Sequence, residues 1–155
     1  MRGKRAPKRE IMADPKFGRT DIAKLTNYIM ERGKKTVAQT IIYDAFDEVA
    51  QKTKKDPMEV FDLAIRNVGP SMEVRGKRVG GANYQIPYPV RAERRFTLAC
   101  RWILEAAHKK KGKRMATKLA DEIIAASTEQ GDAYKKKMDV NKMAEANRAF
   151  AHFAR

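Results

Sequence analysis

The side chains that most often catalyse reactions or bind metals are scarce in this sequence. The chain has two histidines, His108 and His152, and one cysteine, Cys100. Neither histidine has a second histidine or a cysteine at the spacing of a metal site. Cys100 lies on the apolar stripe of an expected helix, where a buried structural thiol is typical. Gly80-Gly81 is not followed by the Lys-Ser/Thr of a phosphate-binding loop. We therefore expect no catalytic residue, no metal and no cofactor.

Basic side chains are abundant instead, and they are unevenly placed. Among 155 residues, 34 Lys and Arg face 19 Asp and Glu, which gives a formal net charge of +15. The excess is concentrated in residues 1–19, 71–95 and 96–115, whereas residues 20–70 are balanced. Such a charge indicates a polyanionic partner, either nucleic acid or an anionic membrane surface. Its concentration in three segments favours a binding surface over a uniformly solubilising one.

Several classes of protein are excluded by simple features. A single cysteine cannot form an internal disulfide, which argues against a disulfide-stapled secreted scaffold. No apolar run approaches the ~20 residues of a membrane-spanning helix. The first residues lack the apolar stretch of a secretory signal. We expect an intracellular protein with no membrane partner.

Four groups of residues are candidates for nucleic-acid binding, and each has an alternative structural explanation. The N-terminal arm is either a phosphate-binding segment that orders on binding or a disordered solubilising tail. Its basic residues are Arg2, Lys4, Arg5, Lys8 and Arg9. An expected hairpin can enter a groove and stack on an unpaired base, or its cations only protect a strand edge. Its candidates are Arg75, Lys77, Arg78 and Tyr84.

The other two groups lie around the next expected helix. Arginines cluster where the hairpin returns to that helix, and their planar forks suit phosphate; they are Arg91, Arg94 and Arg95. A dense basic turn follows the helix and is either a phosphate site or a solvated helix C-terminus. It comprises Lys109, Lys110, Lys111, Lys113 and Arg114. The triplet Lys135–Lys137 is as well explained by a solvated turn.

Apolar spacing predicts the elements that must position these groups. Residues 1–19 show no sustained period and are expected to form a basic arm. Helical spacing recurs from Thr20 to Gly33, again from Val37 to Val49, and after Asp56-Pro57, a typical capped helix start. Residues 72–91 change to a period of two around Gly80-Gly81, which predicts a projecting β-hairpin with edge character at its prolines.

Three further helices are expected after the hairpin. One begins near Phe96, the next at Met115, and Asp139 is expected to cap the last, with Gly131 and the lysine triplet interrupting the chain before it. The predicted fold is mainly α. It is a single helical domain over residues 1–155, with about six helices and one β-ribbon between the third and fourth helices.

Several motifs resemble those of the bacterial-type ribosomal protein S-seven family of the small subunit. The matching segments cover nearly the whole chain from Asp14, and the hairpin and C-terminal blocks are the most specific. They are Asp14–Gly18, Gly33-Lys34-Lys35, Arg78–Pro87, Arg101-Trp102-Ile103 and Met143–His152. Residues 1–13 match loosely, Gly69 stands where a basic residue is expected, and Tyr88-Pro89 is unusual at the end of the ribbon.

This resemblance implies a structural protein that binds RNA and functions in translation, and it implies that the protein is not an enzyme. Family members bind the 3′ major domain of small-subunit ribosomal RNA, nucleate assembly of the subunit head and lie near the tRNA exit site. The implied partners are that rRNA, exit-site tRNA and mRNA, and the neighbouring proteins S-nine, S-eleven and S-nineteen. By position, the resemblance adds Lys34 and Lys35 to the RNA-facing residues. The implied location is the cytoplasmic ribosome, and the sequence does not distinguish a bacterial ribosome from an organellar one.

Two other functions are compatible with a basic chain of this kind. One is a DNA-architectural protein that uses the ribbon as a minor-groove arm. The other is an RNA-modifying enzyme, which the absence of a catalytic cluster disfavours. Competition between duplex DNA and the rRNA would separate the first alternative from the ribosomal interpretation.

Overall fold

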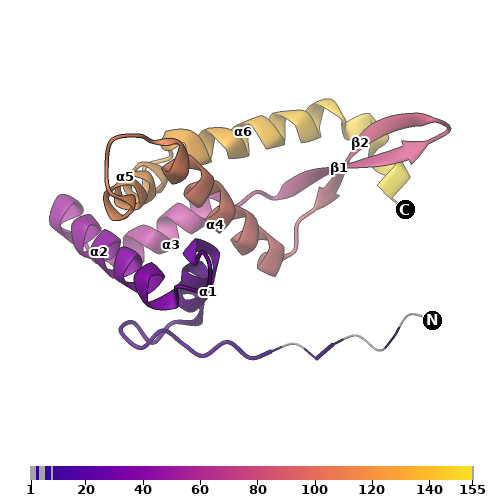
Figure 1. The fold of residues 1–155 in the computed structure, drawn as a ribbon. Helices are drawn as coiled ribbons and strands as arrows, with labels where there is room; N and C mark the ends of the chain where they lie inside the picture. Colours follow the sequence, from indigo (N-terminus) through magenta and orange to yellow (C-terminus); the bar gives the residue numbers. More distant parts are fainter. Residues whose placement is uncertain (1–2, 4–5, 8, 155) are drawn as a thin grey trace. The chain divides into compact units, whose positions relative to one another are not determined.

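A computed structural model describes residues 3, 6–7 and 9–154 of the chain. The chain divides into two compact units, residues 1–40 and 41–155. The described residues form helices α1 to α6, a two-stranded ribbon of β1 and β2 between α3 and α4, and a final 3-10 helix η1 (Figure 1). The predictions of a mainly helical fold, about six helices and one hairpin in this position are confirmed.

The first unit contains a turn, α1 (Thr20–Ile29) and the start of α2 (Lys35–Thr53). The turn is built on Asp14, which is buried and whose carboxylate accepts the backbone N–H groups of Lys16 (3.0 Å) and Phe17 (3.3 Å). Residues 14–19 of the expected arm are therefore held in a hydrogen-bonded turn. In α1, the predicted apolar stripe is buried through Ile22, Leu25 and Ile29. The helix ends at Ile29, four residues before the expected stop at Gly33.

The second unit is a helical core to which the ribbon is attached. It comprises the rest of α2, α3 (Pro57–Val68), α4 (Ala92–Lys109), α5 (Met115–Ser127), α6 (Gly131–Ala146) and η1 (Arg148–Ala154). Phe46 of α2 meets Phe61 of α3 edge to face, with ring centroids 5.6 Å apart. Cys100 is fully buried in α4, so the prediction of a buried thiol is confirmed.

Helix α3 begins where the sequence predicts. The Asp56 carboxylate accepts the backbone N–H of Met58 at 3.1 Å, and Pro57 is the first helical residue. This arrangement satisfies one N–H at the helix start without requiring one from the proline. The helix ends at Val68, immediately before Gly69-Pro70.

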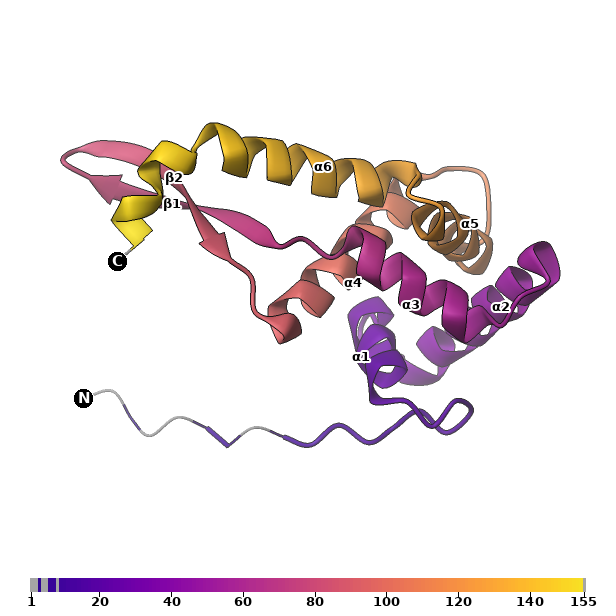
Figure 2. The same ribbon diagram turned by 180° about the vertical axis from the view of Figure 1, so that it is seen from behind.

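The ribbon pairs β1 (Met72–Val79) with β2 (Ala82–Pro89) in antiparallel register, from Met72 opposite Pro89 to Val79 opposite Ala82. Gly80 (φ +57°) and Gly81 (φ +92°) form the two-residue turn. Positive φ at both central residues matches the right-handed twist of the strands, and glycine adopts it without steric cost. The ribbon extends from the helices, but α6 and η1 run along it (Figures 1 and 2).

The predicted start of the last helix is wrong. Asp139 caps no helix, because α6 begins at Gly131 and continues through the lysine triplet Lys135–Lys137. Lysine is a good helix former, so three lysines in succession do not interrupt a helix when their heads reach solvent or a partner. The break lies between α5 and α6, where Glu129 (φ +59°) and Gly131 (φ +90°) reverse the chain.

A buried carboxylate on α5 joins the end of α4 to the start of α6 in this unit. Glu122 of α5 is 0% exposed. One carboxylate oxygen accepts the N–H of Ala133 in the first turn of α6 at 2.9 Å, and the other lies 2.6 Å from the Nζ of Lys110, just after α4. A Cβ at Gly131 would lie 2.8 Å from the first of these oxygens. Glycine is thus required at position 131 both for its φ and for the approach of Glu122.

We predict that Gly131→Ala destabilises the fold more than Gly112→Ala does. Both glycines have positive φ, +90° and +80°, but a Cβ at Gly112 would meet no atom within 4 Å. Backbone strain alone should cost about 1–2 kcal/mol at Gly112. Displacing Glu122 should add about 1–3 kcal/mol at Gly131. Urea unfolding of the two variants measures the difference, and equal midpoints would contradict a tight contact between Gly131 and Glu122.

Candidate nucleic-acid interface

The base of the ribbon carries a carboxylate held between two arginines. Glu73 of β1 is 7% exposed. Its carboxylate accepts hydrogen bonds from a terminal nitrogen of Arg75 and, at 3.2 Å, from the Nε of Arg94 on α4. The side chains of Arg75 and Arg94 are 59% and 43% exposed. Each guanidinium has five N–H donors, so both retain donors that face solvent.

Arg75 is fixed from a second direction by the opposite strand. Its guanidinium lies 5.2 Å from the ring centroid of Tyr88, within the range of a cation–π interaction. Tyr88 is paired with Glu73 in the ribbon register. The unusual Tyr88-Pro89 pair therefore supplies an aromatic face that holds Arg75 beside Glu73.

The pKa of Glu73 reflects this arrangement. Burial of the carboxyl acts to raise the pKa, but the hydrogen bonds and charges of Arg75 and Arg94 outweigh burial, so the pKa lies below its ordinary value. Glu73 is accordingly ionised at neutral pH. The base of the ribbon carries two guanidinium charges and one carboxylate, with a net positive charge directed to solvent.

Arg95, one residue further along α4, caps the preceding helix. Its Nε donates to the carbonyl oxygen of Gly69 at 3.1 Å, just after α3. A Cβ at Gly69 would lie 2.9 Å from the Cγ of Arg95. The absence of the expected basic residue at position 69 is thus explained, because the side chain of Arg95 occupies that space. Arg91 precedes α4 and is exposed.

Lys137 and Asn67 complete the contacts between helix ends. Lys137 Nζ donates to the carbonyl oxygen of Asn67 at 2.6 Å, and the Asn67 amide donates to the carbonyls of Ala126 (3.1 Å) and Ser127 (2.9 Å). Burial and the nearby charge of Arg95 lower the pKa of Lys137. The solvated-turn interpretation is therefore wrong for Lys137, which ties α6 to the end of α3.

Tyr84 and Lys77 of the ribbon contact the C-terminal helix η1. The ring centroid of Tyr84 lies 5.0 Å from that of Phe150 and 5.7 Å from that of Phe153. Lys77 Nζ donates to the carbonyl oxygen of Phe153 at 2.8 Å. The predicted stacking of Tyr84 on a base stays a prediction, and it requires η1 to move away from the ring. Arg78 is exposed near the ribbon tip.

The basic turn between α4 and α5 is largely engaged by acidic side chains. Lys110 pairs with Glu122 at 2.6 Å, Lys113 with Asp121 at 3.0 Å, and Arg114 with Asp44 of α2 at 3.5 Å. Asp121 also accepts Lys52 at 2.7 Å. Burial of Asp121 acts to raise its pKa, and the two lysines outweigh it, so the pKa is lowered.

Two members of this turn remain available for an external partner. Among the described residues, none forms an ion pair with Lys109 or Lys111, and both are exposed. They lie at the opposite end of α4 from Arg91 and Arg94. Because α4 has 18 residues, the two ends are separated by roughly 27 Å at 1.5 Å per residue. The second unit thus presents two separated groups of cations, one at each end of a single rigid helix.

The remaining predicted residues lie in the first unit or outside the described residues. Lys34 and Lys35 are exposed, before and at the first residue of α2. Arg9 is exposed and belongs to no helix or strand. The other arm candidates lie outside the described residues; they are Arg2, Lys4, Arg5 and Lys8.

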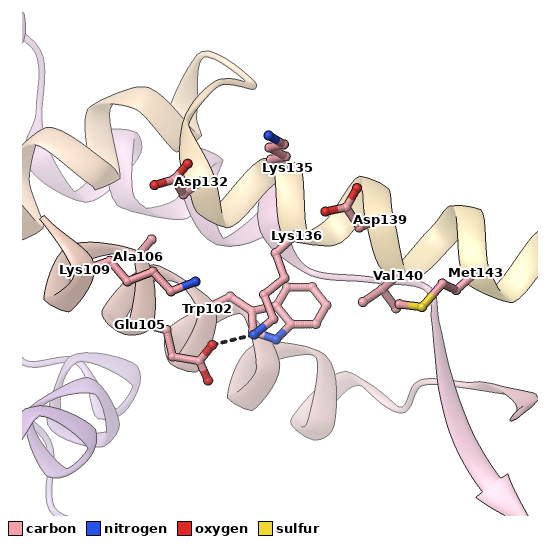
Figure 3. A pocket seen from close by; sticks show the side chains of 10 residues that line it. All are labelled: Trp102, Glu105, Ala106, Lys109, Asp132, Lys135, Lys136, Asp139, Val140 and Met143. Carbon is pink, nitrogen blue, oxygen red and sulfur yellow. Dashed lines mark hydrogen bonds and ion pairs between the residues drawn. The ribbon is translucent and has the colours of Figure 1, made fainter.

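A hollow of about 470 Å³ between α4 and α6 does not extend the basic surface (Figure 3). Trp102 lies in its lining, and Lys136 reaches from α6 to Glu105 on α4 at 2.5 Å. Its charged lining is balanced between three cations and three anions, namely Lys109, Lys135, Lys136, Glu105, Asp132 and Asp139. A hollow without excess positive charge does not favour a polyanion.

The two histidines and the cysteine do not form a common site. His108 is exposed, and His152 is exposed with Nδ1 2.8 Å from the carbonyl oxygen of Ala149. Within the described part of the chain, no three His, Cys, Asp or Glu side chains are placed to share a metal ion. The helices described there include none with the length and apolar character needed to cross a membrane.

Sequence reasoning missed the acidic residues that organise the cations. Glu73 is the only carboxylate between residues 70 and 92, and it lies two residues before Arg75, on the same face of a strand. That spacing could have identified it. No comparable signal identifies Glu122, because its partners Lys110 and Ala133 are distant in sequence.

Fold and charge together define a class, a small helical protein with a β-ribbon that presents fixed cations to a polyanion. Residues 1–148 match the family described as Ribosomal protein S7p/S5e, and the chain belongs to that family. It is similar to the small ribosomal subunit protein uS7 of Thermotoga maritima, with 59% identity over 153 residues and 99% of both chains. It is also similar to uS7 of Methylibium petroleiphilum, with 53% identity over 98% of this chain and 97% of the relative. The family is one of ribosomal proteins and not of enzymes.

We predict that Lys110→Met destabilises the protein by roughly 2–4 kcal/mol, because it leaves the buried Glu122 carboxylate without its cation. Lys111→Met, which removes the same charge from the exposed neighbour, should change stability by less than about 0.5 kcal/mol. Urea unfolding of both variants provides the comparison. Equal stabilities would mean that the pair between Lys110 and Glu122 is not a structural contact.

Proposed function

We propose that this chain is a structural protein of the small ribosomal subunit that binds the 3′ major domain of the rRNA directly and nucleates assembly of the subunit head. Membership of a ribosomal protein family and the naming of its relatives support this proposal. The protein works on the cytoplasmic ribosome as a scaffold and not as a catalyst. Its role is to hold RNA segments in a fixed relation.

The observation that carries the proposal is the separation of exposed cations along α4. Arg75, Arg91 and Arg94 lie at the ribbon end, and Lys109 and Lys111 lie at the other end. A separation of roughly 27 Å, at 1.5 Å per residue, allows the two groups to contact two neighbouring RNA segments. Phosphate contacts at both ends would fix the angle between these segments.

The ribbon and the C-terminal helix are the proposed contacts to the exit site. Exit-site tRNA and mRNA are the expected ligands, and S-nine, S-eleven and S-nineteen are the expected protein neighbours. The ribbon tip extends away from the helices of the second unit (Figure 1), and Arg78 pairs with Asn83 close to that tip. In the first unit, Lys34 and Lys35 are exposed and are proposed as further rRNA contacts.

We predict that affinity for a transcript of the 3′ major domain falls steeply with salt, with log K decreasing by roughly 0.7–0.9 per phosphate neutralised for each tenfold rise in salt. Arg75→Ala combined with Arg94→Ala should reduce that slope by about 2, because each arginine is expected to neutralise one phosphate. The control is Lys24→Ala combined with Arg66→Ala, which removes the same charge from exposed residues of α1 and α3.

Filter binding across a salt series measures both affinity and slope. Equal slopes for the ribbon variant and the control would overturn the assignment of Arg75 and Arg94 to the interface. Equal affinity for duplex DNA and the transcript would favour the DNA-architectural alternative instead.

A second prediction concerns Tyr84. If this ring stacks on an unpaired base, Phe150→Ala combined with Phe153→Ala should free it without changing the charge. Binding of oligouridylate should then tighten by about fivefold, the lower end of what one stacked base contributes. Adding Tyr84→Ala should remove the gain. Unchanged or weaker binding after the Phe substitutions would mean that Tyr84 serves only to hold η1 on the ribbon.

A further inference from the structure

Glu73, the buried carboxylate at the base of the ribbon, lies in a surface that is otherwise positively charged. A carboxylate in a surface that binds RNA repels phosphate, so simple electrostatics gives Glu73 an unfavourable effect on binding. Yet it is 7% exposed, ionised and hydrogen-bonded to two arginines that are themselves exposed. Its position calls for an explanation beyond the net charge of the surface.

The geometry points to Glu73 as a positioning residue for RNA recognition, one that holds the guanidinium groups of Arg75 and Arg94 in a fixed relation so that their remaining N–H donors face one RNA segment. This inference rests on the proposed function and adds to it the residue that organises the binding surface.

Three contacts define the relation between the two arginines. Glu73 Oε1 accepts Arg75, and Glu73 Oε2 accepts the Nε of Arg94 at 3.2 Å. Arg75 also lies over the ring of Tyr88 at 5.2 Å. One arginine comes from the ribbon and the other from the first turn of α4, so a single carboxylate sets the relative position of two elements.

Fixing both guanidinium groups matters because arginine loses considerable rotamer freedom when it binds. An immobilised long side chain reduces affinity, and arranging it before binding removes that cost. Two like charges also repel each other, and the carboxylate between them offsets that repulsion. Glu73 can therefore strengthen phosphate binding although it lowers the net charge of the surface.

The test is Glu73→Gln, which keeps the size of the side chain and raises the formal charge from the present +15 by one. An amide can accept from one arginine, but its NH₂ group faces the donors of the other. We expect affinity for the 3′ major-domain transcript to fall by about tenfold, consistent with freeing two long side chains. Glu59→Gln is the control, since it removes the same charge from an exposed side chain on α3. It should leave affinity unchanged or slightly increased.

A second background keeps the result informative if Glu73→Gln also affects stability. In the variant that carries Arg75→Ala and Arg94→Ala, Glu73→Gln should no longer weaken binding and should strengthen it slightly, because only its charge effect remains. A purely structural role of Glu73 would weaken binding equally in both backgrounds. Thermal unfolding of each variant reports the folded fraction.

The outcomes separate this inference from the proposed function. If the double arginine variant binds the transcript as tightly as the unmodified chain, the proposed interface itself is wrong. If the arginine variant loses affinity but Glu73→Gln binds as tightly as Glu59→Gln, the interface holds and the positioning role is overturned. Weakening by Glu73→Gln in the unmodified background alone supports the inference.

Discussion

The balance between excess positive charge and a small number of inward-facing carboxylates is the constraint on which this structure depends. A formal charge of +15 on 155 residues produces self-repulsion that opposes a compact fold. Three carboxylates pair with basic side chains, and each joins separate elements. Glu73 joins the ribbon to α4, Asp121 holds Lys52 and Lys113, and Glu122 ties Lys110 to the start of α6. A buried carboxylate is stable only when it is paired and hydrogen-bonded, as Glu73 and Glu122 are, whereas Asp121 is half-buried.

The same contacts determine where the remaining cations can act. Arg95 and Lys137 donate to the carbonyl oxygens of Gly69 and Asn67, at the end of α3, where the helix dipole favours positive charge. They link α4 and α6 to α3 near the point from which the ribbon leaves the core. The ribbon base is thereby anchored by side chains and not only by the chain connection. A two-stranded ribbon is marginal on its own, so its orientation depends on this anchoring and on the packing of α6 and η1 along it.

Local chemistry made much of the fold predictable. Asp56-Pro57 caps the helix that follows it, and Gly80-Gly81 forms the turn between adjacent strands. Both effects are local, so the helix start and the turn could be predicted from the sequence. The start of α6 could not be predicted in this way. The lysine triplet suggested a solvated turn, but in the fold it is part of a helix, and Lys136 bonds to Glu105 on α4. For the candidate residues, the sequence indicated which are basic but not which of them are held by contacts within the fold. The sequence indicated that Lys110 and Lys111 are basic, but only the fold shows that Lys110 is engaged by Glu122.

The distinction between arginine and lysine explains why some residues can be both structural and exposed to a ligand. A guanidinium presents five N–H donors in a plane, so Arg75 and Arg94 can each bond to Glu73 and still direct donors outward. An ammonium is a compact charge, and the charge of Lys110 is offset at 2.6 Å by the fully buried Glu122, which holds it toward the fold. The net charge of the chain therefore overstates the number of cations that are exposed and unpaired at the surface proposed to bind RNA. At the ribbon base the same cations stabilise the fold and keep donors exposed to solvent. In the turn after α4, Lys110 is held by the fold, and the exposed cations Lys109 and Lys111 are those proposed for an RNA contact.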